Sequence, residues 1–233
     1  MTAVFVSETG ADAADVAADR LIAAIQKSRR ERGAAHLALA GGTTPRRTYE
    51  LLAARIDDWS RVEVWFGDER AVGPDDAESN FRMASETLLA GGGGPEVHRI
   101  EGEHGPEEAA AAYSEALRER LPIENGVPVL DLALQGLGPD GHTASLFPGS
   151  PAVNADGVCV AVHDAPKPPP DRITLTVPVL RSARAIVFLA TGDEKAEAVR
   201  GLLAGPSPEV PASLLGGERT DVIVDRAAAP PHA

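Results

Sequence analysis

The sequence predicts an α/β fold whose sheet is parallel or mostly parallel and is covered by helices on both faces. Short apolar runs of strand type alternate with helical patterns along all 233 residues, which is typical of parallel sheets. Polar, Gly-rich turns follow several of these runs, as they do at the carboxyl edge of such a sheet. No internal repeat or low-complexity linker divides the sequence, so we expect a single domain over residues 1–233.

The expected strands are short apolar runs bounded by polar, Gly-rich or Pro-rich segments. In chain order they span residues 3–6, 36–40, 61–67, 97–100, 130–134, 157–163, 172–177, 184–190 and 222–224. The first expected helix, residues 11–32, has acidic residues early and basic residues late, which matches the helix dipole, and Gly33 ends it. The other expected helices span residues 45–56, 79–89, 106–121 and 195–204, and Pro45, Ser79 and Pro106 suit their first positions.

Composition excludes several classes of function. The chain carries 22 basic and 35 acidic residues, a formal charge of −13, which argues against binding to nucleic acid or to an anionic membrane. The single cysteine, Cys159, rules out an internal disulfide and a multi-cysteine metal site. No apolar run approaches the length of a membrane span, and residues 1–20 lack a signal-peptide pattern. We therefore expect a cytoplasmic protein, and the acidic surface favours a monomer.

The most informative stretch is LDLALQGLGPDGHTASLFP, residues 130–148. A strand breaks there into a Gly-rich turn that carries Asp140 and His142. Histidine can take a proton near neutral pH, and a carboxylate beside it can fix its tautomer and stabilise its protonated form. The turn therefore predicts a general base at the carboxyl edge of the sheet, followed by one helical turn over residues 143–147.

This stretch has three other interpretations. Its G-x-G-x-x-G spacing formally matches a dinucleotide fingerprint, but Pro139 lies inside it and no long helix pattern follows. A nucleophile elbow would need a serine between glycines, and Ser145 is not placed in that way. The third interpretation is a structural turn with a satisfied histidine.

A second candidate site follows the strand at residues 36–40. Gly41 and Gly42 let the backbone approach a ligand closely, Thr43 and Thr44 offer hydroxyls, and the helix that begins near Pro45 presents free N–H groups. This arrangement suits a phosphate, although no G-K-[ST] follows as in a Walker loop. The alternative is an ordinary strand-to-helix turn.

Further charged groups follow other strands. Asp68, Glu69 and Arg70 come directly after the strand at residues 61–67, where a solvated loop is the alternative. The prolines of KPPPDR can hold Arg172 in a defined place, and Lys195 opens a helix where the dipole disfavours a cation, which indicates an anionic ligand. The turn with His98, Glu101, Glu103 and His104 has no regular ligand geometry, so no metal site is expected there.

Four segments together resemble 6-phosphogluconolactonases: LALAGGTTPRRTYELLA, VWFGDERAVGPDDAESNFRM, LDLALQGLGPDGHTASLFPGS and KPPPDRITLTVPVL. The resemblance implies a Rossmann-like fold and hydrolysis of 6-phospho-D-glucono-1,5-lactone to 6-phosphogluconate in the pentose phosphate pathway, with no metal and no redox cofactor. By position, His142 and Asp140 match the catalytic pair and Arg70 matches a residue that contacts the substrate. The Gly41–Thr44 loop, Arg172 and Lys195 match positions associated with the phosphate.

The closest alternative is glucosamine-6-phosphate deaminase, which resembles this chain in the GGTTP-type loop and the G-x-G-x-D-G-H turn. Its turn continues A-F-N-E-P, and Phe147 stands here where that enzyme has an acidic residue for proton transfer. Asp68 matches the base position of that enzyme, so half of its proton relay is present. In a lactonase Asp68 could instead orient Arg70, bind a sugar hydroxyl or be inherited scaffold. A sugar-phosphate sensor is a second alternative, but the sequence has no helix-turn-helix segment to spare and no basic arm.

A mechanism follows as a hypothesis. Lactone hydrolysis needs an activated water and a stabilised oxyanion. Neutral His142 would take a proton from the water that attacks C1, and Asp140 would orient the imidazole. The oxyanion would be met by N–H groups of the Gly-rich turn or by Arg70, and the sequence leaves both open.

Overall fold

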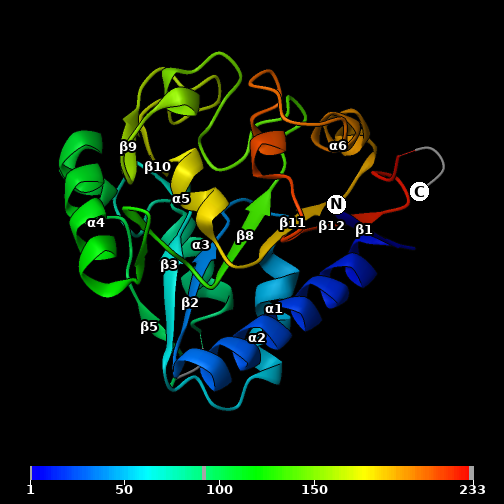
Figure 1. The fold of residues 1–233 in the computed structure, drawn as a ribbon, viewed down its shortest axis with the longest axis horizontal. Helices are drawn as coiled ribbons and strands as arrows, with labels where there is room; N and C mark the ends of the chain where they lie inside the picture. The colour runs from blue at the N-terminus through cyan, green and yellow to red at the C-terminus, as the bar shows by residue number, and fades with distance from the viewer. Residues whose placement is uncertain (1, 91–92, 231–233) are drawn as a thin grey trace.

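Seven parallel strands form the central sheet of the computed structural model, which describes residues 2–90 and 93–230. Their order is β1-β12-β11-β8-β2-β3-β5. The bounds are β1 Ala3–Ser7, β2 Ala35–Leu39, β3 Val62–Phe66, β5 Glu96–Val97, β8 Leu132–Gly136, β11 Ile186–Ala190 and β12 Thr220–Asp225. The predicted α/β class with a mostly parallel sheet is confirmed (Figure 1).

The direction of winding reverses between β2 and β8. From β2 the chain moves outward to β3 and β5, then returns to place β8 on the other side of β2 and continues to β11 and β12. The loops that leave β2 and β8 therefore diverge, and in open α/β sheets the crevice beyond the carboxyl ends of two such strands is where ligands bind.

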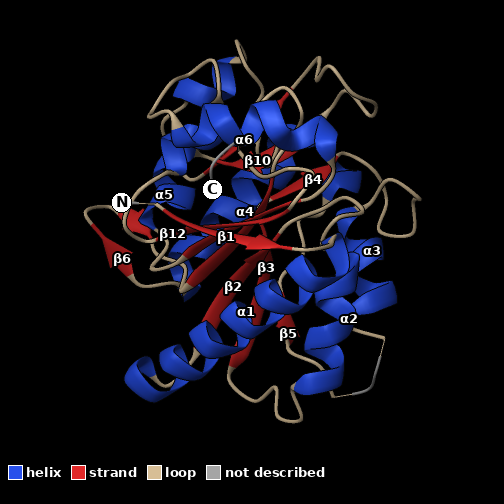
Figure 2. Ribbon diagram, turned by 90° about the vertical axis from the view of Figure 1, so that its right-hand side faces the viewer, coloured by secondary structure: helices blue, strands red, loops and turns tan. Residues whose placement is uncertain are grey.

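Six α-helices of the described residues surround the sheet. They are α1 Gly10–Arg32, α2 Arg46–Arg55, α3 Asn80–Thr87, α4 Pro106–Arg120, α5 Val177–Ser182 and α6 Ala196–Leu203. Helices α1 and α2 lie on one side of the sheet, and α5 and α6 lie on the other (Figure 2). The short α5 was not predicted, because the β-branched Val177 and Val179 favour a strand in the sequence pattern.

The ends of α1 are fixed by local chemistry. Thr9 caps its amino end in a capping box with Asp12, and Gly33 closes its carboxyl end at a φ of 83°. No helix within residues 2–90 and 93–230 combines the length and the apolar character needed to cross a bilayer.

A second, antiparallel sheet corrects part of the sequence prediction. Strands β4 (Asp68–Arg70), β10 (Arg172–Leu175) and β9 (Cys159–Val162) pair in that order and pack against α4. The runs at 157–163 and 172–177 were therefore rightly predicted as strands, but they lie outside the main sheet. The charged segment Asp68–Arg70 is a strand rather than a solvated loop, because β10 supplies its hydrogen-bonding partners. A short hairpin of β6 (Ile123–Glu124) and β7 (Val127–Pro128) completes the strands of the described residues.

Two local predictions were wrong. Residues 143–147 form no helical turn: Thr143 and Leu146 make an antiparallel bridge, and Ala144 takes a left-handed φ of 48°. The Thr143 hydroxyl lies 2.8 Å from Gln135 Oε1 and 2.9 Å from the Gly136 carbonyl oxygen, which draws this turn back onto β8. The strand expected at 97–100 is only Glu96–Val97, because β3 pairs with just those two residues.

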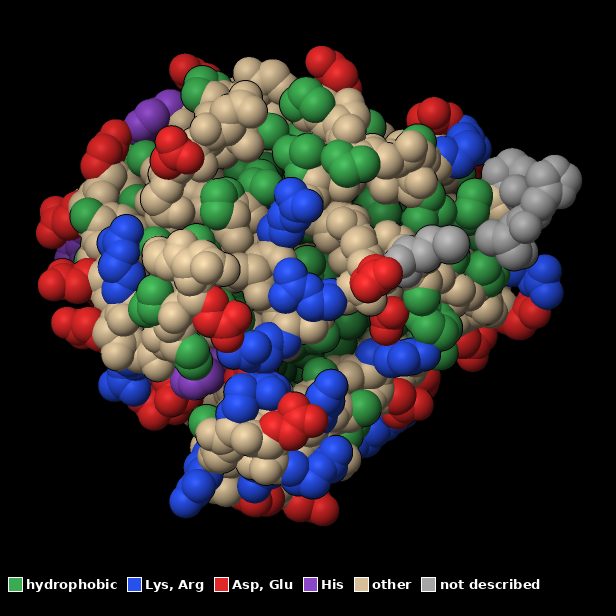
Figure 3. Space-filling view, viewed as in Figure 1, with side chains coloured by type: hydrophobic (Ala, Val, Ile, Leu, Met, Phe, Trp, Pro, Cys, Tyr) green, Lys and Arg blue, Asp and Glu red, His purple; other side chains and the backbone are tan. Residues whose placement is uncertain are grey.

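Charge is not spread evenly over the surface. On the face seen in Figure 3, Lys and Arg side chains gather over the lower centre, and Asp and Glu side chains occupy much of the rim. The interior is built mainly of Ala, Val, Leu and Ile, with Trp65, Tyr49, Phe66 and Phe188 as its largest fully buried side chains.

Candidate active site

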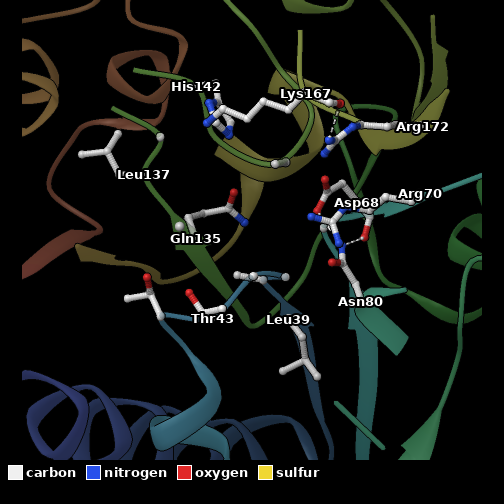
Figure 4. A pocket seen from close by; sticks show the side chains of 18 of the residues that line it. Leu39, Thr43, Asp68, Arg70, Asn80, Gln135, Leu137, His142, Lys167 and Arg172 are labelled. Atoms are coloured by element: carbon white, nitrogen blue, oxygen red, sulfur yellow. Dashed lines mark hydrogen bonds between the residues drawn. The ribbon is translucent and has the colours of Figure 1, made fainter. Parts of the chain in front are cut away.

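A cavity of about 280 Å³ opens at the carboxyl ends of β2, β3 and β8, at the point where the winding reverses. Its lining includes most of the residues singled out in the sequence: Gly41, Gly42, Thr43, Thr44, Asp68, Arg70, His142, Arg172 and Lys195 (Figure 4). Asp140 does not line it but lies against His142. The fold thus brings together residues from five segments that are up to 154 residues apart, from Gly41 to Lys195.

The His142–Asp140 pair has the geometry of an oriented base. Asp140 Oδ1 lies within hydrogen-bond distance of His142 Nδ1 and also 3.3 Å from the His142 backbone nitrogen. When Nδ1–H donates to the carboxylate, Nε2 is left as an acceptor. The ring of Phe147 packs on the imidazole, with 4.6 Å between ring centroids.

The surroundings keep this imidazole neutral. Burial lowers the pKa of His142, and the opposing hydrogen bond and charge of Asp140 do not fully restore it. Burial pushes the pKa of Asp140 upward, but its hydrogen bond with His142 and the charges around it bring that pKa below its ordinary value. Near neutral pH the pair is therefore a carboxylate and an uncharged imidazole, which is the state a general base requires.

Gly138 makes room for the pair. A Cβ at this position would lie 1.9 Å from His142 Nδ1 and 2.5 Å from Asp140 Oδ1. The turn is closed by two hydrogen bonds, from the Gly138 amide to the His142 carbonyl (2.8 Å) and from the Gly141 amide to the Gly138 carbonyl (2.9 Å). Gly141 has a φ of 84°, which a residue with a side chain rarely adopts. The glycines thus bring the backbone close to the catalytic pair.

Asp68 is held by two partners inside the protein. Ser145 donates its hydroxyl to Asp68 Oδ2 at 2.6 Å, and Asn80 Nδ2 donates to Asp68 Oδ1 at 3.1 Å. Ser145 and Asn80 are essentially inaccessible, and Asp68 is only 6% exposed. The hydroxyl of Ser145 therefore serves a buried carboxylate and is not aimed at a substrate.

The other two residues of the DER segment have different surroundings. Glu69 accepts hydrogen bonds from the backbone amides of Asn80 (2.7 Å) and Phe81 (2.8 Å), so its carboxylate holds the amino end of α3. Arg70 lines the cavity and donates from Nη1 to the Glu78 carbonyl, while its buried Nε has no partner among the residues that the structure describes. Arg70 is thus the member of the segment with a donor to spare.

The loop after β2 is arranged as an anion site. Thr43 and Thr44 lead into α2, whose N-cap residue Pro45 offers no side-chain cap. The Arg46 amide donates to the Thr43 carbonyl at 3.3 Å, and no side-chain cap occupies the N–H groups that follow it. Tyr49 anchors the loop by donating to the Ala40 carbonyl at 2.7 Å. A Cβ at Gly41 would meet Asn80 Oδ1 at 1.9 Å, so only glycine allows α3 to approach this closely.

Arg172 begins a strand instead of following one, and it is fixed by the proline segment. Its Nε donates to the Pro169 carbonyl at 3.1 Å, and its Nη2 donates to the carbonyls of Lys167 (2.9 Å) and Pro168 (3.3 Å). Only 4% of the residue is exposed, and burial lowers its pKa. The proline segment holds this basic side chain in place, as expected. The same hydrogen bonds fix the conformation of the segment.

Lys195 reaches the cavity from the start of α6. It is the N-cap residue of that helix and ends a short 3₁₀ turn, Asp193–Lys195, which agrees with its predicted place at a helix start. Partial burial lowers the pKa of its ammonium group. With Arg70, Lys167 and Arg172 it forms a set of four cations around one cavity in a chain of net charge −13.

Three polar side chains of the lining were not selected from the sequence. Lys167 precedes the prolines and extends into the cavity, Asn80 is the first residue of α3, and Gln135 is the penultimate residue of β8 (Figure 4). The motif KPPPDR contained a signal for Lys167, since the same prolines position both of its basic ends. Asn80 and Gln135 had none, because single amides carry no local pattern.

The turn at residues 98–104 does not gather its four polar side chains. Arg99 pairs with Glu103 at 2.5 Å and with Glu101 at 3.5 Å, and His104 lies 3.5 Å from Glu101. His98 points elsewhere, to Glu63 at 2.8 Å.

Comparisons with known proteins agree on one family. Residues 8–224 match the family model described as glucosamine-6-phosphate isomerases/6-phosphogluconolactonase. A 6-phosphogluconolactonase of Streptomyces coelicolor is 40% identical over 93% of this chain and 89% of its own length. The crystal structure of 6-phosphogluconolactonase from Trypanosoma brucei superposes with a TM-score of 0.88, at 30% identity and 98% coverage of both chains. A monomeric glucosamine-6-phosphate deaminase has a similar fold, with a TM-score of 0.79 at 24% identity over 97% of this chain and 98% of its own.

Proposed function

This chain belongs to the family of glucosamine-6-phosphate isomerases and 6-phosphogluconolactonases, and we propose that it hydrolyses 6-phospho-D-glucono-1,5-lactone to 6-phosphogluconate in the pentose phosphate pathway. Its curated relatives carry the name 6-phosphogluconolactonase. The observation that carries the proposal is the neutral imidazole of His142, oriented by Asp140 at one side of a cavity that four cations line.

In this proposal His142 Nε2 takes a proton from water as the water oxygen attacks C1 of the lactone. Asp140 holds the tautomer and stabilises the imidazolium that forms. Ring opening then needs a proton on the departing ring oxygen, which the same imidazolium can return. General-base catalysis of this kind contributes roughly 10²–10⁴-fold, and a lactone is a reactive ester.

Arg70 is the oxyanion donor that the geometry favours. The amides of Gly138, Gly141 and His142 already donate within their turn. Arg70 lines the same cavity, and its buried Nε has no partner among the described residues. A preorganised cation at the developing negative charge is more effective in such a site than in water.

The phosphate would bind at the end of the cavity formed by the Gly41–Thr44 loop, Arg172 and Lys195, with Lys167 as a further cation. Backbone N–H groups at the start of α2 complete the donor set. Binding energy at the phosphate would hold C1 beside His142 and so make the attack effectively intramolecular.

The deaminase alternative is weaker on two grounds. A phenyl ring, Phe147, packs on His142 where that reaction needs a further proton carrier. Asp68, the matching base position, is engaged on both carboxylate oxygens by Asn80 and Ser145. We propose that Asp68 positions the DER strand against the His142 turn.

The test uses purified protein with freshly prepared lactone and a chelator, and follows 6-phosphogluconate above the spontaneous rate. Glucosamine 6-phosphate is assayed in parallel for ammonia. Lactone hydrolysis that is lost in His142→Ala is the expected result. Ammonia release would establish the deaminase, and tight sugar-phosphate binding without turnover would establish a sensor. A monomeric state and a cytoplasmic location stay predictions, which size-exclusion chromatography and cell fractionation test.

A further inference from the structure

Four residues lie in a row across the amino ends of β2, β3 and β5, which are neighbouring strands (Figure 1). The cavity lies beyond the carboxyl ends of β2 and β3, at the opposite edge of the sheet. His36 is the register partner of Glu63, and Glu63 is the register partner of Glu96. Register partners on neighbouring parallel strands point to the same face, about 4.8 Å apart, and a residue two positions further along does so too. His98 therefore joins the row.

Ligand atoms of Glu63, Glu96 and His98 lie within 4.8 Å of one another, and His36 lies beside this group, next to Glu63. His98 Nε2 lies 2.8 Å from Glu63 Oε2 and 3.5 Å from Glu96 Oε1, and His36 Nδ1 lies 3.7 Å from the same Glu63 oxygen. Zinc bonds of about 2.1 Å in a tetrahedral arrangement place ligand atoms roughly 3.4 Å apart. The observed separations are close to that spacing without any movement of the backbone.

Two observations indicate that the row can take a further partner. His36 Nδ1 is buried and has no hydrogen-bond partner among the described residues. Buried polar atoms are nearly always paired, so a single unpaired one directed at a carboxylate needs an explanation. In addition, a hollow of about 420 Å³ opens beside the row, and its lining holds four carboxylates, of Asp57, Asp58, Glu63 and Glu96, against one cation, Arg61.

We propose that Glu63, Glu96 and His98 bind a divalent transition-metal ion of the zinc type, and that the His36 side chain turns toward the ion as its fourth ligand. Two imidazole nitrogens and two carboxylate oxygens suit zinc better than magnesium or calcium, which prefer oxygen ligands alone. The ion joins three neighbouring strands, so it stabilises this edge of the sheet. It takes no part in the reaction, because the catalytic cavity lies at the other edge.

His98 is well prepared for such a role. Its ring stacks on Trp65 with centroids 4.1 Å apart, and its backbone amide continues the pairing with β3 by donating to the Val64 carbonyl at 2.8 Å. Its orientation is thus set before any ion arrives, which lowers the entropic cost of binding.

Arg120 is the competitor for the same place. From the end of α4 its Nη1 lies 2.8 Å from Glu96 and 3.7 Å from Glu63, so it now balances the two carboxylates. Its side chain is 48% exposed, and it can swing into solvent when an ion binds. Removal of the Arg120 charge should therefore strengthen metal binding. If Glu63 and Glu96 served only as salt-bridge partners of Arg120, the same substitution would remove the salt bridge and produce no gain in metal affinity.

The test is calorimetric titration of the full chain with zinc chloride after treatment with a chelator and dialysis. The wild type is expected to bind one equivalent, with affinity lowered at least tenfold in His36→Gln and His98→Gln and raised several-fold in Arg120→Gln. Glu96→Gln, at a half-exposed side chain, is the variant that retains the fold if the histidine variants do not. Zinc is also expected to raise the melting temperature of the wild type and not of these ligand variants.

His163→Gln is the matched control. His163 also lies between two carboxylates, 2.7 Å from Glu107 and 2.8 Å from Asp171, but on an exposed surface. Binding that is absent in the wild type, or that survives in His36→Gln, His98→Gln and Glu96→Gln, would overturn the proposal. Binding lost only in His163→Gln would assign the ion to the exposed group instead. Lactone hydrolysis should be equal in wild type and His36→Gln.

Discussion

The buried carboxylate of Asp68 accepts a 2.6 Å hydrogen bond from Ser145, which lies 77 residues further along the chain. This contact ties the DER strand to the turn that carries His142. It also indicates a structural role for both residues. The Ser145 hydroxyl donates its hydrogen bond to Asp68, and Ser145 lacks the glycine-flanked turn that would expose it as a nucleophile.

Ser145→Ala therefore tests whether the reaction has a covalent step. We expect kcat to stay within a few-fold of the wild type, because the attacking group is water. The protein should lose roughly 1.5–3 kcal/mol of unfolding free energy, the range for a hydrogen bond to a charged group. Urea unfolding and steady-state kinetics measure the two effects. A fall in kcat of several orders of magnitude with little loss of stability would show instead that Ser145 is the nucleophile.

Gly138→Ala should act like removal of the base. The added methyl group would overlap His142 Nδ1, so the imidazole must turn away from Asp140. We expect kcat to fall by roughly the 10²–10⁴-fold of general-base catalysis. Gly73→Ala is the matched control, because a Cβ at Gly73 meets nothing within 4 Å. Full activity in Gly138→Ala would mean that the His142–Asp140 contact is not needed.

The pH profile should show one acid limb that belongs to His142. Burial lowers the pKa of this imidazole, and the base works only when neutral. kcat/KM should therefore be level at neutral pH and fall as the pH drops through that lowered pKa. The measurement subtracts the spontaneous hydrolysis of the lactone at each pH.

Asp140→Asn should move that limb in a defined direction. The hydrogen bond and the negative charge of Asp140 both raise the pKa of His142. Without them the imidazole stays neutral to lower pH, so the limb shifts to lower pH while the plateau rate falls for lack of orientation. A limb that stays in place would assign the titration to another group.

Lys195 and Arg172, the two cations proposed to bind the phosphate, should both affect KM but differ in their effect on the stability of the fold. Lys195→Ala is expected to raise KM with little change in kcat, since it binds ground state and transition state alike. Arg172→Ala should raise KM too, and should also destabilise the fold, because its guanidinium donates to three carbonyls of the proline segment. Kinetics and thermal unfolding on both variants provide the comparison. An unchanged KM in Lys195→Ala would remove that residue from the phosphate site.

Much of the site could be predicted because its signals are local. The Gly-rich turn with Asp140 and His142, and the loop at Gly41–Thr44, are each contained in fewer than ten residues. Turn chemistry and helix ends act over that range. The helical turn expected after His142 was wrong because the Thr143 side chain bonds back to β8 across the turn, a contact that the hydrophobic pattern of the segment does not show.

The sequence by itself determined the alternation of strands and helices and the turns at which chemistry could occur, because hydrophobic period and backbone preference are properties of neighbouring residues. Only the tertiary structure decided what lies beside what. The pairing of Asp68 with Ser145, the cap that Glu69 provides to α3, and the row from His36 to His98 all depend on the register between distant strands. That register is set by packing of the whole core, which no short stretch of sequence contains.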